Sequence, residues 1–569
     1  MGQHRTTGMI CLAAVLLGLM VSLIARGTSD IFPLYQVQSQ DLPILIALPP
    51  LLILTILFAP RLPLPDRLPP RPVLILSGGI LVALLGWGSH ALMGDFPLSR
   101  DEHMVVFDMA VFDKGRIAAP LAPAWRAYAE TLVPAFLAKM DNPLALVSDY
   151  LPANAWLRLA FSRIADPAFF NPMLVLVGAL ALHDIAKRAF GADVRARWVV
   201  FLIYALSTQM LVTAMTTYAM TAHMALNLVW LAAFLRGGRA GHGVAILTGF
   251  VAMGLHQIVF HPLFVAPFLL WRLRDGQWRL VLLYGAAYLA MTGCWVGYSH
   301  WAATAAGGVA AHGAAGPPDN FFVRRVLPLL VERDPLTIPY MILNLLRFVA
   351  WQNLALLPLL VAALPLGWRD RGVAGPLLWG VVLLLVFISF ILPFQGHGWG
   401  YRYLHQLLGS FALLGGFGYR RLADRIGTKA DGLVWVLSAA TLLGAMPVLL
   451  ARVDGFVAPH VALERTIAAR RSDFVLIDTS VSPSTDGRWT ANAIDHVRNR
   501  PDLDNHPLRF SSRTMTAPML AELCRRGTLS LVTRADMHHA GFAPTLPEDS
   551  PRFRALVGTL GDARCLRRP

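Results

Sequence analysis

The chain has 569 residues, of which 56% are hydrophobic and 15% are charged, and its mean hydropathy is +0.54. This composition excludes an ordinary soluble enzyme, because soluble domains carry about 25% charged residues. Lys and Arg outnumber Asp and Glu by 49 to 34. In a membrane chain such an excess indicates loop charge that sets topology rather than a nucleic-acid surface. We therefore expect a polytopic membrane protein with no nucleic-acid partner.

Long apolar runs recur along most of the chain, and runs of about 17–25 residues can cross a bilayer as helices. They predict an all-α polytopic membrane domain of about 13 transmembrane helices over residues 1–452. The first run lacks a clear small-x-small cleavage site and is expected to remain as a helix that also directs insertion. The expected helices fall at residues 9–25, 42–58, 72–92, 173–185, 198–215, 219–235, 243–258, 260–271, 280–298, 353–366, 376–392, 404–417 and 432–450.

Basic residues gather in every second connection between these runs, for example at residues 61–71, 187–197 and 420–429. Cytoplasmic loops carry such an excess. The other connections then lie outside, the largest of them at residues 94–171. We expect a multi-pass protein of the bacterial inner membrane with a cytoplasmic N-terminus and, because the number of helices is odd, a periplasmic C-terminus.

The large outer loop contains three amphipathic stretches, "DEHMVVFDMAVFDKG", "APAWRAYAETLVPAFLAKM" and "SDYLPANAWLRLAF". Apolar residues recur in them at helical spacing, which predicts interfacial helices lying flat on the outer membrane surface. Their aromatic residues form either a membrane-interface belt or a platform for a sugar.

From about residue 453 the chain becomes polar, and residues 453–569 are expected to form a small periplasmic α/β module. "SDFVLIDTS" and "TLSLVTR" are typical of short buried strands, and "HVALERTIAAR" and "APMLAELCRR" of amphipathic helices. Two of the four cysteines, Cys524 and Cys565, lie here and can form one disulfide in an oxidising compartment. No cysteine or histidine spacing predicts a metal site.

A cluster of charged residues follows the third apolar run, in the stretch "SRDEHMVVFDMAVFDKGRIAAP" at residues 99–120. A carboxylate beside apolar surface has a raised proton affinity, so Asp101 can act as a general base toward a hydroxyl. The same stretch also suits a helix start, with Ser99 or Asp101 as the cap and carboxylates in the first turn. One residue can serve both purposes, and both interpretations stay open.

Two later segments interrupt the apolar runs on the same predicted face. The joint "GLHQIVFHPLFVAPFLLWR" holds His256, His261 and Pro262, and its histidines either bind an anion or bond to carbonyls freed at the proline. The segment "QGHGWGYRYLHQLLGSFALL" places glycines just before Arg402 and Tyr403. Arg402 suits fork-like binding of a phosphate, or it anchors a helix at the membrane interface.

Taken in order, these motifs resemble the GT-C superfamily of integral membrane glycosyltransferases, which includes protein O-mannosyltransferases and the bacterial transferases that put aminoarabinose on lipid A. "RDEHMVVFDMAVFDKGRIAAP" looks like their acidic motif, "SDYLPANAWLRLAF" like their Tyr-Pro-Pro-Gly stretch, and "GWGYRYLHQLLGSFALLG" like their Gly-x-Arg-Tyr segment. The resemblance covers residues 94–417. The chain departs from it at His261-Pro262, where many relatives have Arg-Pro, and two helices are added before the acidic motif.

This resemblance implies an inverting GT-C-type glycosyltransferase that moves a sugar from a polyprenyl-phosphate donor to an envelope acceptor, which is a lipid, a polysaccharide or a protein, at the periplasmic face. Asp101 would be the catalytic base, and Glu102 would support it or help to hold a divalent metal; no other cofactor is implied. The donor phosphate would bind Arg402 and the region of the two histidines. The candidate substrate-binding residues are His103, Tyr150, His256, His261, His397, Arg402 and Tyr403.

Three other classes of protein remain open at the level of sequence. An oligosaccharide polymerase or ligase would place its large outer loop late in the chain. A transporter or flippase for a lipid-linked or small solute would show paired broken helices in two related halves, with ionisable residues near the middle of the membrane. A catalytically silent membrane scaffold would use the C-terminal module for protein contacts.

Overall fold

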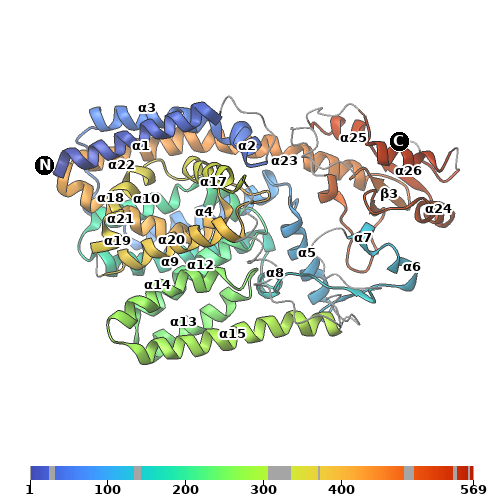
Figure 1. The fold of residues 1–569 in the computed structure, drawn as a ribbon, viewed down its shortest axis with the longest axis horizontal. Coiled ribbons are helices and arrows are strands. Elements are labelled where there is room, and N and C mark those ends of the chain that lie inside the picture. The colour runs from blue at the N-terminus through green and yellow to red at the C-terminus, as the bar shows by residue number, and fades with distance from the viewer. Residues whose placement is uncertain are drawn as a thin grey trace.

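The computed structural model describes residues 2–24, 32–133, 143–305, 335–369, 372–479, 493–542, 548–561 and 564–567. Over these residues the protein is a bundle of long helices with a small α/β module at one end of its longest axis (Figure 1). The long helix α23 (Met446–Ala468) runs from the bundle into the module. The predicted fold class, an all-α polytopic membrane domain followed by a small α/β module, is confirmed.

The N-terminal helices pack along one side of the bundle. The helix α1 (Gly2–Ile24) lies against α3 (Leu42–Phe58), which contains no charged residue. Between them the chain forms the short helix α2 (Phe32–Gln36) and the π-helical turn η1 (Val37–Asp41). The helix α4 (Arg71–Ala91) then leads to the predicted large outer loop.

That loop contains one regular helix at each end of its described part, α5 (Arg100–Asp113) and α8 (Ala153–Ser162), which pack against each other. Between them lie α6 (Pro123–Arg126), α7 (Ala129–Leu132) and a short antiparallel pair of strands, β1 (Ala119–Pro120) and β2 (Ala145–Leu146). The end of the stretch "APAWRAYAETLVPAFLAKM" lies outside the described residues.

The remaining helices complete the bundle, and each predicted apolar run overlaps at least one helix or helical turn. They are η2 (Pro167–Phe169), α9 (Phe170–Phe190), α10 (Val194–Ala205), α11 (Thr208–Ala214), α12 (Met220–Arg236), α13 (Gly238–Met253), α14 (Phe260–Arg274), α15 (Trp278–Ala305), α17 (Thr337–Trp351), α18 (Leu356–Ala363), α19 (Leu366–Arg369), α20 (Ala374–Ile391), η4 (Arg402–Leu407), α21 (Leu408–Ile426), α22 (Lys429–Ala440) and η5 (Thr441–Ala445).

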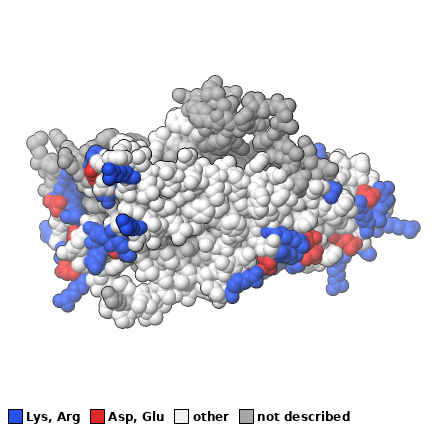
Figure 2. Space-filling view, turned by 90° about the horizontal axis from the view of Figure 1, so that it is seen from below, with Lys and Arg blue, Asp and Glu red and all other residues white. Residues whose placement is uncertain are grey.

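Within the described residues, six helical spans are long and apolar enough to cross a membrane, or eight if each of two bent helix pairs counts as one span. Other predicted runs form shorter helices such as α12, α13 and α14. In Figure 2 the charged side chains gather toward the two ends of the long axis, and the broad band between them carries few. This distribution is that of a polytopic membrane protein.

The basic connections meet at the end of the bundle that lies away from the module. They are tied together there by ion pairs between different connections, Arg195 with Asp66 and Asp431, Arg236 with Asp184, and Arg420 with Asp193. The positive-inside pattern therefore corresponds to one face in space. The segments predicted to lie on the opposite face, around Asp101 and Arg402, also come together.

Two features of the bundle differ from the sequence-based expectation. The helix α17 falls within residues 300–352, a connection that the alternating charge pattern predicts to be an outer loop. It forms a pair with α18 that is bent by 116°. Its polar residues Asn344 and Arg347 interrupt the apolar pattern, yet both are fully buried. The helix α23 continues to Ala468, so the compositional change near residue 453 falls inside a helix and does not mark its end.

Most of the helix α5 is covered by protein, although Val106 is 40% exposed. One face, with Met104, Phe107 and Val111, belongs to the same apolar core as Phe510 and Leu520 of the C-terminal module. The other face turns toward the bundle and packs against α8. The composition of the loop predicts its amphipathic helix correctly, but the partner of the apolar face is protein rather than lipid.

The C-terminal module is built on a three-stranded parallel sheet in the order β4-β3-β5. Its strands are β3 (Phe474–Ile477), β4 (Leu508–Ser511) and β5 (Leu529–Val532), with β3 paired in parallel to both neighbours. Helical segments surround the sheet, namely η7 (Ala493–His496), α24 (Ala517–Arg526), α25 (Arg534–His539) and α26 (Pro551–Gly558). The sequence predicts β3, β5 and α24, and it misses β4.

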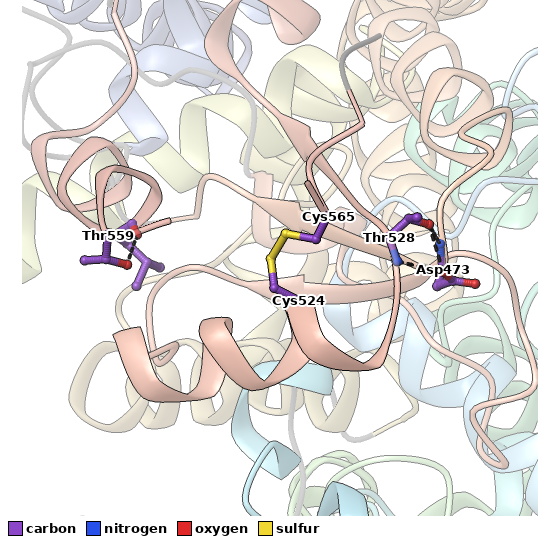
Figure 3. The surroundings of a disulfide bond; sticks show 6 residues. Asp473, Cys524, Thr528, Thr559 and Cys565 are labelled. Carbon is purple, nitrogen blue, oxygen red and sulfur yellow. Dashed lines mark hydrogen bonds between the residues drawn. A yellow bond between two sulfur atoms is a disulfide. The ribbon is translucent and has the colours of Figure 1, made fainter. Parts of the chain in front are cut away.

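A disulfide joins Cys524 on α24 to Cys565, as the sequence allows (Figure 3). It holds the C-terminal segment beside β5, where the Leu529 backbone N–H donates to the Cys565 carbonyl at 2.8 Å. At the start of the sheet, the Asp473 carboxylate accepts hydrogen bonds from the backbone N–H and the hydroxyl of Thr528. Disulfides persist in oxidising compartments, which is the environment expected for the predicted outer face.

Replacing both Cys524 and Cys565 by serine is expected to destabilise the module by about 4 kcal/mol, because the bond closes a loop with a sequence separation of 41 residues. Limited proteolysis across a denaturant series, followed by gel electrophoresis, measures the change. Cys294→Ser is the matched control, since Cys294 is an exposed free thiol on α15. Equal protease resistance of the double variant and the control would contradict the prediction.

Candidate functional site

The start of α5 is fixed by a capping box. The Ser99 hydroxyl accepts a hydrogen bond from the Glu102 backbone N–H, and the Glu102 carboxylate accepts one from the Ser99 backbone N–H at 3.2 Å. The second Glu102 oxygen accepts from the Thr217 backbone N–H between α11 and α12, also at 3.2 Å. Burial raises the pKa of Glu102 to about 7 against the opposing effect of these N–H groups. Glu102 therefore anchors α5 to the bundle.

Asp101 points from the same turn toward the bundle and forms an ion pair with Arg402, on η4. Both side chains are nearly buried, with exposed fractions of 13% and 12%. The other Asp101 oxygen accepts a hydrogen bond from the Tyr150 hydroxyl. Burial alone would raise the pKa of Asp101, but the charge of Arg402, then that of His256, and the Tyr150 hydrogen bond lower it to about 2. With Arg402 in place, Asp101 is held as a carboxylate.

Glycines shape the segment before Arg402, because side chains would not fit there. A Cβ on Gly398 would lie 2.9 Å from the Arg402 side chain. Gly400 has a φ of +62°, a conformation that favours glycine, and a Cβ there would lie 2.6 Å from the Gln209 side chain. The run Gly-His-Gly-Trp-Gly thus allows Arg402 to fold back against its own loop. The Arg402 guanidinium also donates to the His397 carbonyl at 3.1 Å.

Buried polar side chains from other elements hold the carbonyls of this loop. Arg347 of α17 donates to the Gly398 carbonyl at 3.0 Å, and Gln209 of α11 donates to the Tyr401 carbonyl at 2.8 Å. The Tyr218 hydroxyl donates to the His397 carbonyl at 3.0 Å. The sequence analysis missed all three donors, because each lies inside an apolar helix or at a helix end with no motif around it.

A small cavity opens beside Asp101 between α5, α8 and the α13–α14 joint, with room for about one water molecule. His256 lies in its wall, and its ring packs edge-on against Tyr150 with 4.5 Å between ring centroids. The lining residues are Asp101, Val105, Asp108, Tyr150, Leu151, Asn154, Ala155, Tyr218, Ala219, Leu255 and His256. Asp101, Arg402, Tyr150 and His256, predicted from separate segments, are thus brought together.

The cavity also contains Asp108, which the sequence analysis did not single out. It follows Asp101 by seven residues, so two helical turns place both on one face of α5. The Asp108 side chain is buried and receives a hydrogen bond from Ser148. Burial raises its pKa to about 8. The signal that could have revealed Asp108 is the seven-residue spacing of two carboxylates in an amphipathic helix.

The other candidate residues lie away from this cavity. His261 is fully buried and bridges Asn227 and Tyr288, with ring nitrogens 2.7 and 2.8 Å from their oxygens, so it serves helix packing. His103 lies on the opposite face of α5, near the charged residues of the module, and burial lowers its pKa to about 3.

His397 and Tyr403 flank Arg402 without lining the cavity. The His397 ring stacks on Phe456 of α23, with ring centroids 4.9 Å apart. The Tyr403 ring lies under the Arg402 guanidinium at 5.2 Å and against Phe260 at 6.0 Å between centroids. Both residues therefore help to fix the surroundings of Arg402.

A divalent metal finds no ready ligand set at this site. No group of three or more His, Cys, Asp or Glu side chains that could hold a metal occurs among the residues described. The resemblance implies that Glu102 could help to hold a divalent metal. Both of its carboxylate oxygens already accept hydrogen bonds, from Ser99 and Thr217.

Comparison with solved structures finds, among others, two crystal structures of ArnT from Cupriavidus metallidurans that are similar to this chain. The one bound to undecaprenyl phosphate has a TM-score of 0.49 and 13% sequence identity, and the match covers 76% of this chain and 86% of that chain. The apo structure has a TM-score of 0.46 and 13% identity, with coverages of 76% and 85%. No family model and no curated protein matches the chain.

Fold and site together define a polytopic helical membrane protein with a charged cavity where the bundle meets an α/β module.

The raised pKa of Asp108 predicts a pH-dependent effect of Asp108→Asn on stability. Between an unfolded-state pKa of about 3.9 and the folded-state pKa of about 8, the folded protein holds a proton that the unfolded chain has lost, so wild-type stability falls as the pH rises. Asn cannot ionise, so the variant should gain about 5 °C in Tm over the wild type between pH 5 and pH 9. Thermal unfolding in detergent across this range measures the difference.

Asp113→Asn is the control, since Asp113 lies on the same helix in an exposed ion pair with Arg163. A Tm difference between Asp108→Asn and the wild type that stays constant from pH 5 to pH 9 would show that folding does not raise the pKa of Asp108.

Proposed function

We propose that the protein is an inverting membrane glycosyltransferase that moves a sugar from a polyprenyl-phosphate donor to a hydroxyl of an envelope acceptor at the periplasmic face. The single observation that carries this proposal is the ion pair of Asp101 and Arg402 at the edge of a buried cavity. It joins a carboxylate that can accept a proton and a guanidinium that can bind a phosphate, which are the two groups that sugar transfer from a phosphate requires.

Arg402 is suited to the donor phosphate, because a guanidinium offers a rigid fork of donors and stays charged. Its Nε is buried without a hydrogen-bond partner among the described residues. A phosphate beside Arg402 would supply an acceptor for this group and would stabilise the charge that develops on the leaving phosphate.

Asp101 becomes a stronger base when such a phosphate binds. In the ligand-free protein Arg402 lowers the pKa of Asp101 to about 2, which makes the carboxylate a weak proton acceptor. A phosphate that engages the guanidinium weakens its attraction for Asp101, and the burial of Asp101 then raises its proton affinity. The acceptor hydroxyl can therefore lose its proton to Asp101 as its oxygen attacks the anomeric carbon and the phosphate leaves from the opposite side.

An apolar cleft beside Arg402 suits the lipid part of the donor. It lies between α17, α18, α20 and α21, encloses about 700 Å³ with its open side included, and reaches Leu404, two residues after Arg402. Its walls include Leu345, Phe348, Val381 and Phe411. A polyprenyl chain in this cleft would leave its phosphate at Arg402.

The variants Asp101→Asn and Arg402→Gln separate chemistry from binding. Asp101→Asn is expected to bind polyprenyl phosphate at least as tightly as the wild type, because the competing carboxylate is gone, while transfer falls about 100-fold or more. Arg402→Gln should lose about 10- to 100-fold in affinity for polyprenyl phosphate, as for a charge-assisted hydrogen bond. Binding is measured with the purified protein in nanodiscs.

Transfer is measured in cells by profiling the glycans of envelope lipid, polysaccharide and protein at equal expression, with Asp113→Asn as the control. An unchanged glycan profile with Asp101→Asn would exclude Asp101 as the base. Equal affinity of the wild type and Arg402→Gln for polyprenyl phosphate would exclude the phosphate site.

A further inference from the structure

The helix α17 borders the apolar cleft with one of its faces, on which Leu345 and Phe348 lie. Beside this face runs a second row of side chains, formed by Asn344, Arg347 and Trp351. Their spacings of three and four residues place them on one side of the helix. All three are fully buried, and two of them are polar. Because buried polar side chains need hydrogen-bond partners, this row has to meet polar groups of another element.

The partner of this row is the glycine-rich loop, residues 393–401, which leads directly to Arg402. Each side chain of the row meets a different part of the loop. In order along the loop, the contacts are the Asn344 amide to the Pro393 carbonyl at 3.1 Å, the Arg347 guanidinium to the Gly398 carbonyl at 3.0 Å, and the Trp351 side chain against Gly400. A loop with three glycines has wide conformational freedom, so its shape depends on such contacts.

Arg347 is itself held in one orientation by the N-terminal helices. Its Nε donates to the Asp41 carboxylate at 3.0 Å. Its two terminal nitrogens donate to the side-chain oxygens of Gln36 and Gln40. All three guanidinium nitrogens therefore have partners, and the hydrogen bond to the Gly398 carbonyl is in place before any ligand binds.

A second contact fixes the end of the loop from the bend between α17 and α18. Gln352, which follows α17, donates to the Gln209 side-chain oxygen at 2.8 Å, and Gln209 donates to the Tyr401 carbonyl at 2.8 Å. The Ser207 hydroxyl donates to the Gln352 oxygen at 2.7 Å, so this amide is also held in one direction. Gln352 lines the apolar cleft as well. One residue thus borders the cleft and, through Gln209, holds the carbonyl just before Arg402.

We propose that Arg347 and Gln352 are positioning residues that hold Arg402 where the phosphate of a cleft-bound polyprenyl donor lies. This inference rests on the proposed function, because it takes the cleft and Arg402 as the two parts of the donor site. Both residues act through the backbone of the loop and do not themselves bind the phosphate. A loop that is ordered in advance loses less entropy when the phosphate binds, which increases affinity. The helix α17 in this way aligns the chain and the phosphate of one lipid.

The test uses the full-length protein in nanodiscs and two probes with the same chain, polyprenyl phosphate and polyprenol. The ratio of their affinities isolates the contribution of the phosphate, because the fit of the chain cancels. We expect Gln352→Leu to lower this ratio about tenfold, since leucine cannot donate to Gln209. The double variant Asp41→Asn/Arg347→Met should lower it at least as much. It removes both charges together, so that neither is left buried and unpaired.

A double-mutant cycle with Arg402→Gln separates positioning from a general loss of structure. In the Arg402→Gln background, Gln352→Leu should leave the ratio unchanged, because no guanidinium remains to be positioned. Tyr419→Phe is the matched control. It removes a buried hydrogen bond, to Asp431, at the end of the bundle away from the module, and it should keep the wild-type ratio.

Gel filtration and Tm show which variants fold, and Gln352→Leu or the double variant decides the question if the other does not fold. The proposal is overturned if the folded variants keep the wild-type ratio, or if Gln352→Leu lowers the ratio equally with and without Arg402. A decrease of the same size in Tyr419→Phe would also overturn it. If the wild type binds polyprenyl phosphate no more tightly than polyprenol, or if Arg402→Gln alone leaves the ratio unchanged, the proposed phosphate site is wrong instead.

Discussion

The ion pair of Asp101 and Arg402 is the interaction on which the geometry of the site depends. It joins residues 301 positions apart in the chain and closes α5 onto the glycine-rich loop. Two charges that are nearly withdrawn from water require further partners, since their attraction alone rarely offsets the loss of hydration. Tyr150 supplies one partner to Asp101, and the His397 carbonyl supplies one to Arg402. Each of these contacts also fixes a different segment at the cavity.

A second buried ion pair supports the first from the N-terminal side. Arg347, which holds the Gly398 carbonyl, donates to the Asp41 carboxylate at 3.0 Å, and Trp351 donates to the other Asp41 oxygen at 2.6 Å. Asp41 ends the π-helical turn η1, between α2 and α3. Breaking a buried pair costs about 3–5 kcal/mol because it leaves one charge unpaired. The N-terminal helices, which the family resemblance does not account for, thus reach the loop that carries Arg402.

The sequence predicts the parts of this structure that follow from local pattern. Apolar length locates the membrane helices, and Ser99 or Asp101 as a cap with carboxylates in the first turn predicts the start of α5, because a helix cap needs only a few adjacent residues. The convergence of Asp101 with Arg402 follows from topology, since both were assigned to one face. What could not be predicted depends on contacts across the fold. Arg347 makes α17 resemble a loop, although its charge is neutralised by Asp41 from a distant helix.

His261 illustrates the opposite error, because a histidine beside a proline kink is typical of both a ligand site and a packed core. Only its neighbours decide between them, and these are Asn227 and Tyr288, from two other helices. Asp108 belongs to no sequence motif. Its place in the cavity wall depends on the packing of α8 against α5, which the sequence does not show.

The C-terminal module completes the site by holding α5 from outside. Arg498 donates to the Pro97 carbonyl just before the capping box, and Asp502 pairs with Lys114 and Arg116 just after α5 ends. Between these points, the apolar face of α5 is part of the core of the module. The helix that carries Asp101 and Asp108 is therefore fixed at both ends and along one side by the module. A membrane domain without it would leave this apolar face uncovered, so the module belongs to the structural frame of the cavity.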